Sequence, residues 1–153
     1  MIHPAISMGS DKWLSLHHYE NSANNVGRCV QTLKKKGYQI VATALAPNTI
    51  SLYDLPINQP MAFCFGTELT GLTDECIQYA DYHVTIPMYG FTESFNISNA
   101  VAITLSYMIE KIRSENIQWQ LTEQEHKELY LEWLKKSIKD AEMIIEKFLS
   151  QQL

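Results

Sequence analysis

The sequence is poor in cysteine, and its three cysteines follow no recognisable spacing. Cys29, Cys64 and Cys76 are odd in number and contain no C-x-x-C pair. Such a scattered set favours neither a disulfide framework nor a zinc site. We therefore predict three reduced thiols in the protein core.

Several other signatures are missing. No apolar run approaches the roughly 20 residues that span a bilayer, and no signal-peptide pattern opens the chain. The sequence contains no G-x-S-x-G, P-loop or G-x-G-x-x-G motif, and its five histidines show no metal-ligand spacing. These absences predict a cytoplasmic protein without a membrane or metal partner. The formal net charge of −5 also argues against a surface that binds phosphates everywhere, although a local basic patch remains possible.

The sequence is rich in alternating apolar strand and helix patterns. Its 153 residues, 46% of them hydrophobic, suffice for one well-buried core, so we expect a single domain over residues 1–153. The patterns predict, in chain order, a possible strand within 11–21, a helix within 23–38, strands within 38–45 and 61–66, a helix within 73–80, a strand within 82–87 and a helix within 96–113. This order predicts a parallel α/β sheet flanked by helices, because parallel neighbours need helical crossovers.

A further helix is expected near the C-terminus, from about residue 122 to residue 149. Its apolar positions Leu134, Ile138, Ala141, Ile145 and Phe148 repeat at alternating steps of four and three. A helix with such a stripe needs a partner surface. Packing on its own domain and packing across a subunit interface both fit the pattern.

Polar loops follow the three predicted strands, at 43–47, 66–72 and 87–96. In open parallel sheets, ligands bind outside the carboxyl ends of the strands, where loops and helix N-termini converge. Glu68 could cap the helix that starts near Leu72, orient its loop or hold a substrate group. Ser94 and Asn96 stand just before a buried helix, where one such residue suffices as a cap. His83, inside an expected strand, is interpreted as a surface or core histidine and not as a catalyst.

Two of these loops resemble the motifs of a known enzyme family. The stretch "FGTELTGL" resembles the second motif of the SpoU/TrmH RNA 2'-O-ribose methyltransferases, and "IPMYGFTESFNISNAVAI" resembles the third. The flanking segments "GSDKWLSLHHYEN", "LKKKGYQIVATAL" and "LTEQEHKELYLEWLKKSIKDAE" are similar to the tRNA guanosine branch. The resemblance therefore covers nearly the whole chain.

The resemblance implies a SPOUT-type fold with a C-terminal trefoil knot, S-adenosylmethionine as the cofactor, and a homodimer with its active sites at the subunit interface. It makes Glu68, Ser94 and Asn96 the candidate catalytic residues. Two lysine clusters, Lys34, Lys35 and Lys36 and then Lys135, Lys136 and Lys139, become candidates for RNA binding, although such clusters are more often solvated faces. The positions that match the family's cofactor pocket are Thr43, Ala44, Leu45, Gly66, Ile86, Met88, Ser94 and Phe95.

Two departures from the family pattern matter. Phe95 stands where the third motif usually carries leucine or methionine. The family's first motif, an asparagine and glycine followed by an arginine, is missing, and we expect that the sequence begins after it. The stretch "NNVGRCVQT" imitates that motif with Gln31 in the arginine's place and Arg28 nearby. We interpret this likeness as coincidence, because its neighbours match the family's next helix.

Three hypotheses for function follow. The first is an S-adenosylmethionine-dependent RNA 2'-O-methyltransferase acting on tRNA or rRNA, with tRNA guanosine in the D-loop region as the favoured target. The second is a catalytically silent knot module that binds cofactor or RNA, or only dimerises. The third is a flavodoxin-like nucleotide binder, which rests on fold class alone.

Overall fold

The computed structural model describes residues 9–20, 23–92 and 94–151. Contacts divide the chain into two compact units, one made of residues 18–117 and the other of residues 1–17 with 118–153. Each unit is described by itself below. The single domain expected over residues 1–153 therefore stays a prediction.

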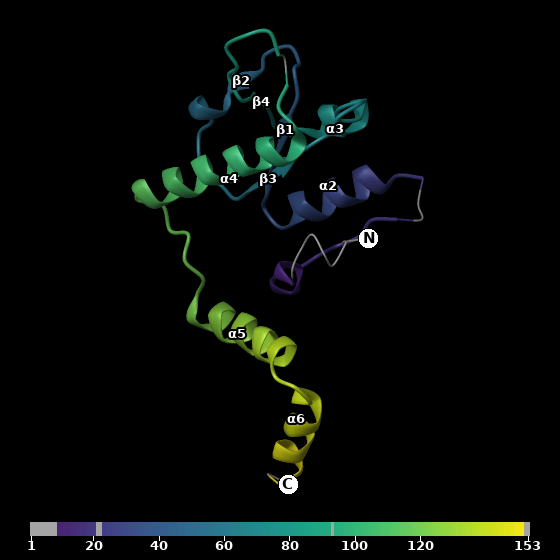
Figure 1. The fold of residues 1–153 in the computed structure, drawn as a ribbon, viewed down its shortest axis with the longest axis vertical. Coiled ribbons are helices and arrows are strands. Elements are labelled where there is room, and N and C mark those ends of the chain that lie inside the picture. Colours follow the sequence, from purple (N-terminus) through teal and green to yellow (C-terminus); the bar gives the residue numbers. More distant parts are fainter. Residues whose placement is uncertain (1–8, 21–22, 93, 152–153) are drawn as a thin grey trace. The chain divides into compact units, whose positions relative to one another are not determined.

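The larger unit is built on a four-stranded parallel sheet (Figure 1). The strands lie in the order β2-β4-β1-β3, so β4, the last strand in the chain, is inserted between β1 and β2. Their bounds are β1 Gln39–Thr43, β2 Ile50–Ser51, β3 Met61–Cys64 and β4 Tyr82–Thr85. The register pairs Val41 with Phe63 on one side and with Tyr82 on the other. The predicted parallel α/β sheet is confirmed, including three of its four strands.

The inner strand β1 lies within the hydrophobic core, and both of its faces are covered. Ile40, Val41 and Ala42 are fully buried, as is typical of a central parallel strand. Val41 packs with Val84 of β4 and with Leu52 and Leu55, which follow β2. Helix α4, Ile97–Ser114, adds Met108 to the same cluster and thus packs against the sheet.

Two shorter helices complete this unit. Helix α2, Asn25–Lys35, and helix α3, Asp74–Tyr79, contact each other and β1. The Thr73 hydroxyl accepts a hydrogen bond from the Cys76 N–H and so caps α3, as the sequence predicts. The pattern analysis missed β2 and the 3-10 helix η2, Leu52–Asp54, because both are very short and lie in a proline-broken loop.

The smaller unit contains the 3-10 helix η1, Ser10–Trp13, and helices α5, Glu123–Ser137, and α6, Ala141–Ser150. The single helix expected from about 122 to 149 is wrong. The chain leaves the helical conformation at Ile138 and turns at Asp140, which has a left-handed φ of 57°. The strand expected within residues 11–21 is also wrong over its described part, because η1 forms there and residues 14–20 join no strand. Asn21 lies outside the described residues.

The three cysteines are free and lie in the larger unit. Cys76 is buried, and Cys29 and Cys64 are partly buried. Burial, followed by the neighbouring Cys76, raises the pKa of Cys64 to about 12, so its thiol stays protonated at neutral pH. The predicted core position holds for Cys76, while the reduced state of the three thiols stays a prediction. Among the described residues, no helix has the length and apolar character needed to cross a membrane.

Candidate functional site

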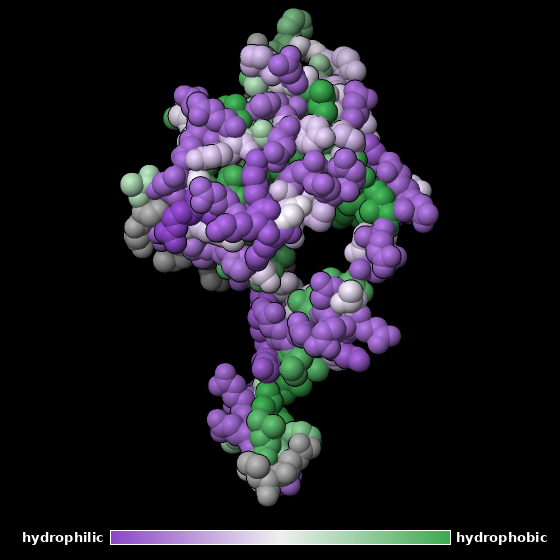
Figure 2. Space-filling view, turned by 180° about the vertical axis from the view of Figure 1, so that it is seen from behind, coloured by the Kyte–Doolittle hydropathy of each residue, from purple (hydrophilic) through white to green (hydrophobic). Residues whose placement is uncertain are grey.

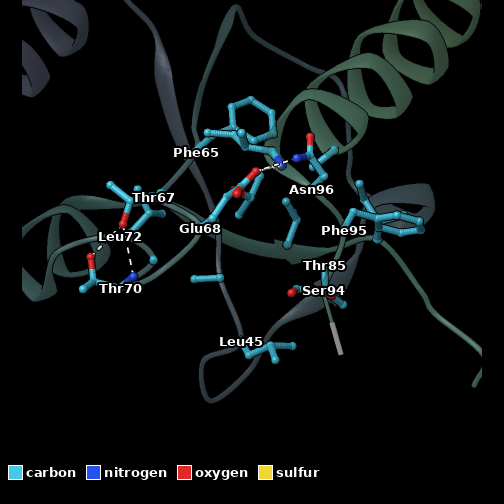
Figure 3. Close-up of a pocket in the computed structure, with 18 of the residues that line it drawn as sticks. Leu45, Phe65, Thr67, Glu68, Thr70, Leu72, Thr85, Ser94, Phe95 and Asn96 are labelled. Atoms are coloured by element: carbon cyan, nitrogen blue, oxygen red, sulfur yellow. Dashed lines mark hydrogen bonds between the residues drawn. The ribbon is translucent and has the colours of Figure 1, made fainter. Parts of the chain in front are cut away.

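A cavity of about 580 Å³ lies at the carboxyl ends of β1, β3 and β4. Its volume falls within the range of small-molecule sites, roughly 300 to 1,000 Å³. Three loops line it, and each follows one of these strands (Figure 3). All ten predicted catalytic and cofactor-binding residues take part in the lining, namely Thr43, Ala44, Leu45, Gly66, Glu68, Ile86, Met88, Ser94, Phe95 and Asn96. The structure thus brings them together, while their individual roles stay predictions.

The loop after β3 is a tight turn held by its own backbone. Thr67 and Gly71 exchange two backbone hydrogen bonds, of 3.0 and 2.9 Å, and Gly71 has a left-handed φ of 68°. The Thr67 hydroxyl also accepts a hydrogen bond from the Thr70 N–H. A Cβ atom at Gly66 would collide with the backbone of Gly71 and Leu72. Gly66 is therefore required for the chain to fold back on itself at the wall of the cavity.

Glu68 projects from this turn and joins it to the loop after β4. One Glu68 carboxylate oxygen accepts a hydrogen bond from the Asn96 side-chain amide at 2.6 Å and a longer one from the Ile97 N–H at 3.4 Å (Figure 3). Asn96 in turn caps α4, since its side-chain oxygen accepts from the Ser98 N–H. Glu68 therefore stabilises the start of α4 and not the helix near Leu72, which Thr73 caps.

The remaining wall is mainly apolar. Ile86, Met88, Leu45 and Phe95 contribute hydrocarbon surface, and the backbone of Thr43 to Leu45 runs along the end of β1. Among the described lining residues, Glu68 is the only ionisable side chain. Such a site suits a ligand with a flat apolar part and a positive charge. Sequence reasoning missed further lining residues that carry no motif signal of their own, including Phe65, Thr85, Ile97 and Ala100.

The residues of the imitation motif lie elsewhere. Arg28 and Gln31 are on α2, which contacts α3 and β1 and contributes no described residue to the cavity. This placement agrees with the interpretation of "NNVGRCVQT" as a coincidental likeness. Glu93, within the third motif, lies outside the described residues.

The six candidate RNA-binding lysines are all exposed, and two of them have carboxylate partners. Lys34 pairs with Asp81 at 2.8 Å, and Asp81 also accepts a hydrogen bond from the Ile40 N–H. Lys136 pairs with Glu132 one turn earlier on α5 at 2.6 Å. Lys34 thus ties α2 to the start of β4, an inner strand, which leaves Lys35 and Lys36 as the stronger candidates in that cluster.

The comparisons with known proteins agree with this geometry. The model of the SpoU rRNA Methylase family matches residues 3–106. The chain belongs to the SpoU methylase family. Membership of this family argues against the third hypothesis, a flavodoxin-like nucleotide binder, which rested on fold class alone.

Two of the curated relatives carry the same name. The chain is 43% identical over 143 residues to the tRNA (guanosine(18)-2'-O)-methyltransferase of Borreliella burgdorferi, covering 94% of this chain and 64% of that protein. It is 30% identical over 135 residues to the protein of the same name from Aquifex aeolicus, covering 86% and 62%. The chain therefore spans less than two thirds of either relative.

Solved structures of the family share the fold. The A. aeolicus TrmH/SpoU tRNA modifying enzyme superposes with a TM-score of 0.74 at 29% identity, over 91% of this chain and 70% of that one. The SpoU methyltransferase AviRb from Streptomyces viridochromogenes, in complex with AdoMet, gives a TM-score of 0.52 at 27% identity, over 61% and 38%. These likenesses confirm the predicted SPOUT-type α/β fold. The trefoil knot itself stays a prediction.

Proposed function

We propose that this chain is an S-adenosylmethionine-dependent RNA 2'-O-ribose methyltransferase, with tRNA guanosine in the D-loop region as its target. The observation that carries the proposal is one cavity lined by both family motifs, at the strand ends where ligands of parallel sheets bind. The names of the relatives support the substrate class, and the AdoMet complex of AviRb supports the cofactor. A tRNA substrate also fits the predicted cytoplasmic location.

The cavity's residues fit this cofactor. Leu45, Ile86, Met88 and Phe95 offer apolar surface for an adenine ring, and the backbone after β1 offers hydrogen-bonding groups to its edge. Glu68 supplies negative charge on the side of the cavity near α4. When bound, the cofactor provides a sulfonium methyl that is already activated, so the protein must mainly align the ribose oxygen and assist removal of its proton.

The contacts of Glu68 favour a positioning role for it. Its carboxylate already accepts hydrogen bonds from Asn96 and Ile97, and these fix the two motif loops against each other. A ribose hydroxyl is a weak acid, and no other ionisable side chain stands among the described lining residues. The proton acceptor in this proposal is therefore a group from the partner subunit or an RNA phosphate.

The same shortage of ionisable groups favours a second candidate, the catalytically silent knot module. Two measurements on the isolated chain separate the candidates. Calorimetry with S-adenosylmethionine and methyl transfer to unmodified tRNA, mapped to the modified ribose, should both be positive for the enzyme. Cofactor binding without turnover supports the silent module, and no heat of cofactor binding contradicts the proposed enzyme.

Glu68→Ala tests the proposed arrangement of the two loops. Loss of its hydrogen bonds frees the start of α4, so we expect cofactor affinity and methyl transfer each to fall by at least about tenfold, the effect of losing a charged hydrogen bond. Glu110→Ala is the matched control, because Glu110 is an exposed carboxylate on α4 outside the cavity. Equal behaviour of the two variants would exclude this role for Glu68.

We also infer that the protein is a homodimer. The support within this chain is the apolar surface of α5 and α6, where Leu131, Ile138 and Ile144 line a groove and remain about half exposed. Figure 2 shows apolar side chains gathered along these C-terminal helices. Sedimentation velocity should give the mass of two chains, and Ile144→Glu should shift it toward one. A wild-type monomer at micromolar concentration contradicts the dimer.

A further inference from the structure

Two aromatic side chains on the third-motif loop are exposed and do not line the cavity. Tyr89 is 97% exposed and Phe91 is fully exposed, on either side of Gly90. Their loop also supplies Met88, Ser94 and Phe95 to the cavity wall, yet neither aromatic lines the cavity itself. The two rings therefore stand in solvent beside the candidate site.

Two tyrosines elsewhere in the same unit pack against each other. Tyr107 packs edge-on against Tyr53 with the ring centroids 4.8 Å apart, and its hydroxyl donates a hydrogen bond to the Tyr53 carbonyl. Among the described residues, neither Tyr89 nor Phe91 pairs with another aromatic ring. A large aromatic surface left open beside a ligand site is a feature of binding surfaces.

The chemistry of the loop indicates what it can bind. Residues 87–92 are Pro, Met, Tyr, Gly, Phe and Thr, so this segment has no charged side chain with which to bind phosphates. Its aromatic faces can stack on nucleobases, which is how single-stranded and splayed RNA is commonly recognised. A ribose presented to the cavity carries its base, and its neighbours' bases, to the rim where this loop lies.

We infer that Tyr89 and Phe91 form a stacking platform for nucleobases of the bound tRNA next to the methylated ribose. This inference rests on the proposed function. The absence of charged side chains from residues 87–92 and the two open aromatic faces favour nucleobases as the occupant, and a second protein subunit is an outcome of the test below. Stacking also requires a planar π face, whereas a contact between subunits is served equally well by aliphatic surface.

That distinction defines the experiment. The double variant Y89L/F91L keeps apolar side chains and removes both aromatic faces, whereas Y89W/F91W keeps the faces. Base stacking is typically worth a fivefold to 100-fold change in affinity, roughly, for each stacked base. We expect Y89L/F91L to weaken tRNA binding by at least about fivefold in a fluorescence anisotropy titration, and Y89W/F91W to bind as the wild type does. Affinity for S-adenosylmethionine should stay the same in both.

Leu69→Ala is the matched control. Leu69 is 94% exposed on the turn after β3, does not line the cavity and has no aromatic ring, so its removal should leave tRNA affinity unchanged. Unchanged tRNA affinity in Y89L/F91L, in a wild type that binds tRNA, overturns the inference alone. A changed sedimentation coefficient in Y89L/F91L also overturns it, because the rings then contact a second subunit. A wild type that binds no tRNA overturns the proposed function together with the platform.

Discussion

The two units of this chain differ in how they are held together. Every buried side chain of the described residues lies within residues 18–117, where the sheet and α4 close around Val41, Leu52, Leu55 and Val84. The described parts of η1, α5 and α6 have no buried residue. In the smaller unit, α5 has a capping box while η1 and α6 have no side-chain cap, and none of the three helices is held by a buried core; hydrophobic packing holds the larger unit. Hydrophobic packing of the elements around a site holds its side chains in position to within the tolerance that catalysis needs, and local helix capping does not.

Truncating one leucine in each unit gives the largest expected difference. Leu52 is fully buried in the core cluster, so Leu52→Ala should lower the free energy of unfolding by about 2–5 kcal/mol. Leu149 on α6 is about half exposed and does not line the groove of α5 and α6, so Leu149→Ala should cost less than about 1 kcal/mol. Urea unfolding followed by circular dichroism measures both. Equal losses would show that the smaller unit has a core as well packed as that of the sheet.

Sequence patterns predicted the larger unit well because burial and chain periodicity agree there. The runs that became β1, β3 and β4 are apolar and bounded by loops, and α4 begins at Ile97, directly after its cap Asn96 and within one residue of the expected start. The prediction of one continuous C-terminal helix was wrong because the apolar stripe continues through Ile138 without a glycine or proline to mark the break between α5 and α6. No local signal shows that Asp140 adopts a left-handed conformation.

The residues of the candidate site could be predicted from the sequence, but the hydrogen bonds between them could not. Loops after parallel strands were expected to converge, and the resemblance to a family supplied the residues of the cavity. The bond between Glu68 and Asn96 was beyond sequence reasoning, because it joins residues 28 positions apart that only the folded loops bring together. The sequence pattern alone favours Glu68 as a cap for the helix that directly follows it, because that helix is its nearest partner along the chain.

Removing one threonine cap from each unit sharpens the comparison. Thr122 and Glu125 form a reciprocal capping box at the start of α5, and Thr73 caps α3. Each Thr→Ala change should cost about 0.5–2 kcal/mol locally. Because α3 contacts α2 and β1, Thr73→Ala should lower the urea midpoint of the whole unit.

Thr122→Ala should act differently, since α5 buries no side chain. We expect faster amide hydrogen exchange along residues 123–137 with little change in the unfolding midpoint of the larger unit. Hydrogen exchange read by mass spectrometry separates the two responses. A midpoint shift as large as that of Thr73→Ala would mean that α5 unfolds together with the sheet.

The smallest expected effect concerns the charge pair that ties α2 to the sheet. Partial burial alone would raise the pKa of Asp81, but hydrogen bonds from the Ile40 N–H and Lys34, with the Lys34 charge, lower it overall. A carboxylate whose pKa is lowered by folding adds stability above its unfolded pKa, near 3.9. That contribution is lost as the pH falls through 3.9 toward the folded value.

Asp81→Asn should therefore cost up to about 1 kcal/mol at pH 7, a small effect because the pair is more than one third exposed to solvent. The difference between wild type and variant should shrink as the pH falls below 3.9, which urea midpoints at several pH values will show. Asp54→Asn is the matched control, because Asp54 is an exposed carboxylate of the same unit. A difference that is constant across this range would mean that Asp81 acts through its shape and not through its charge.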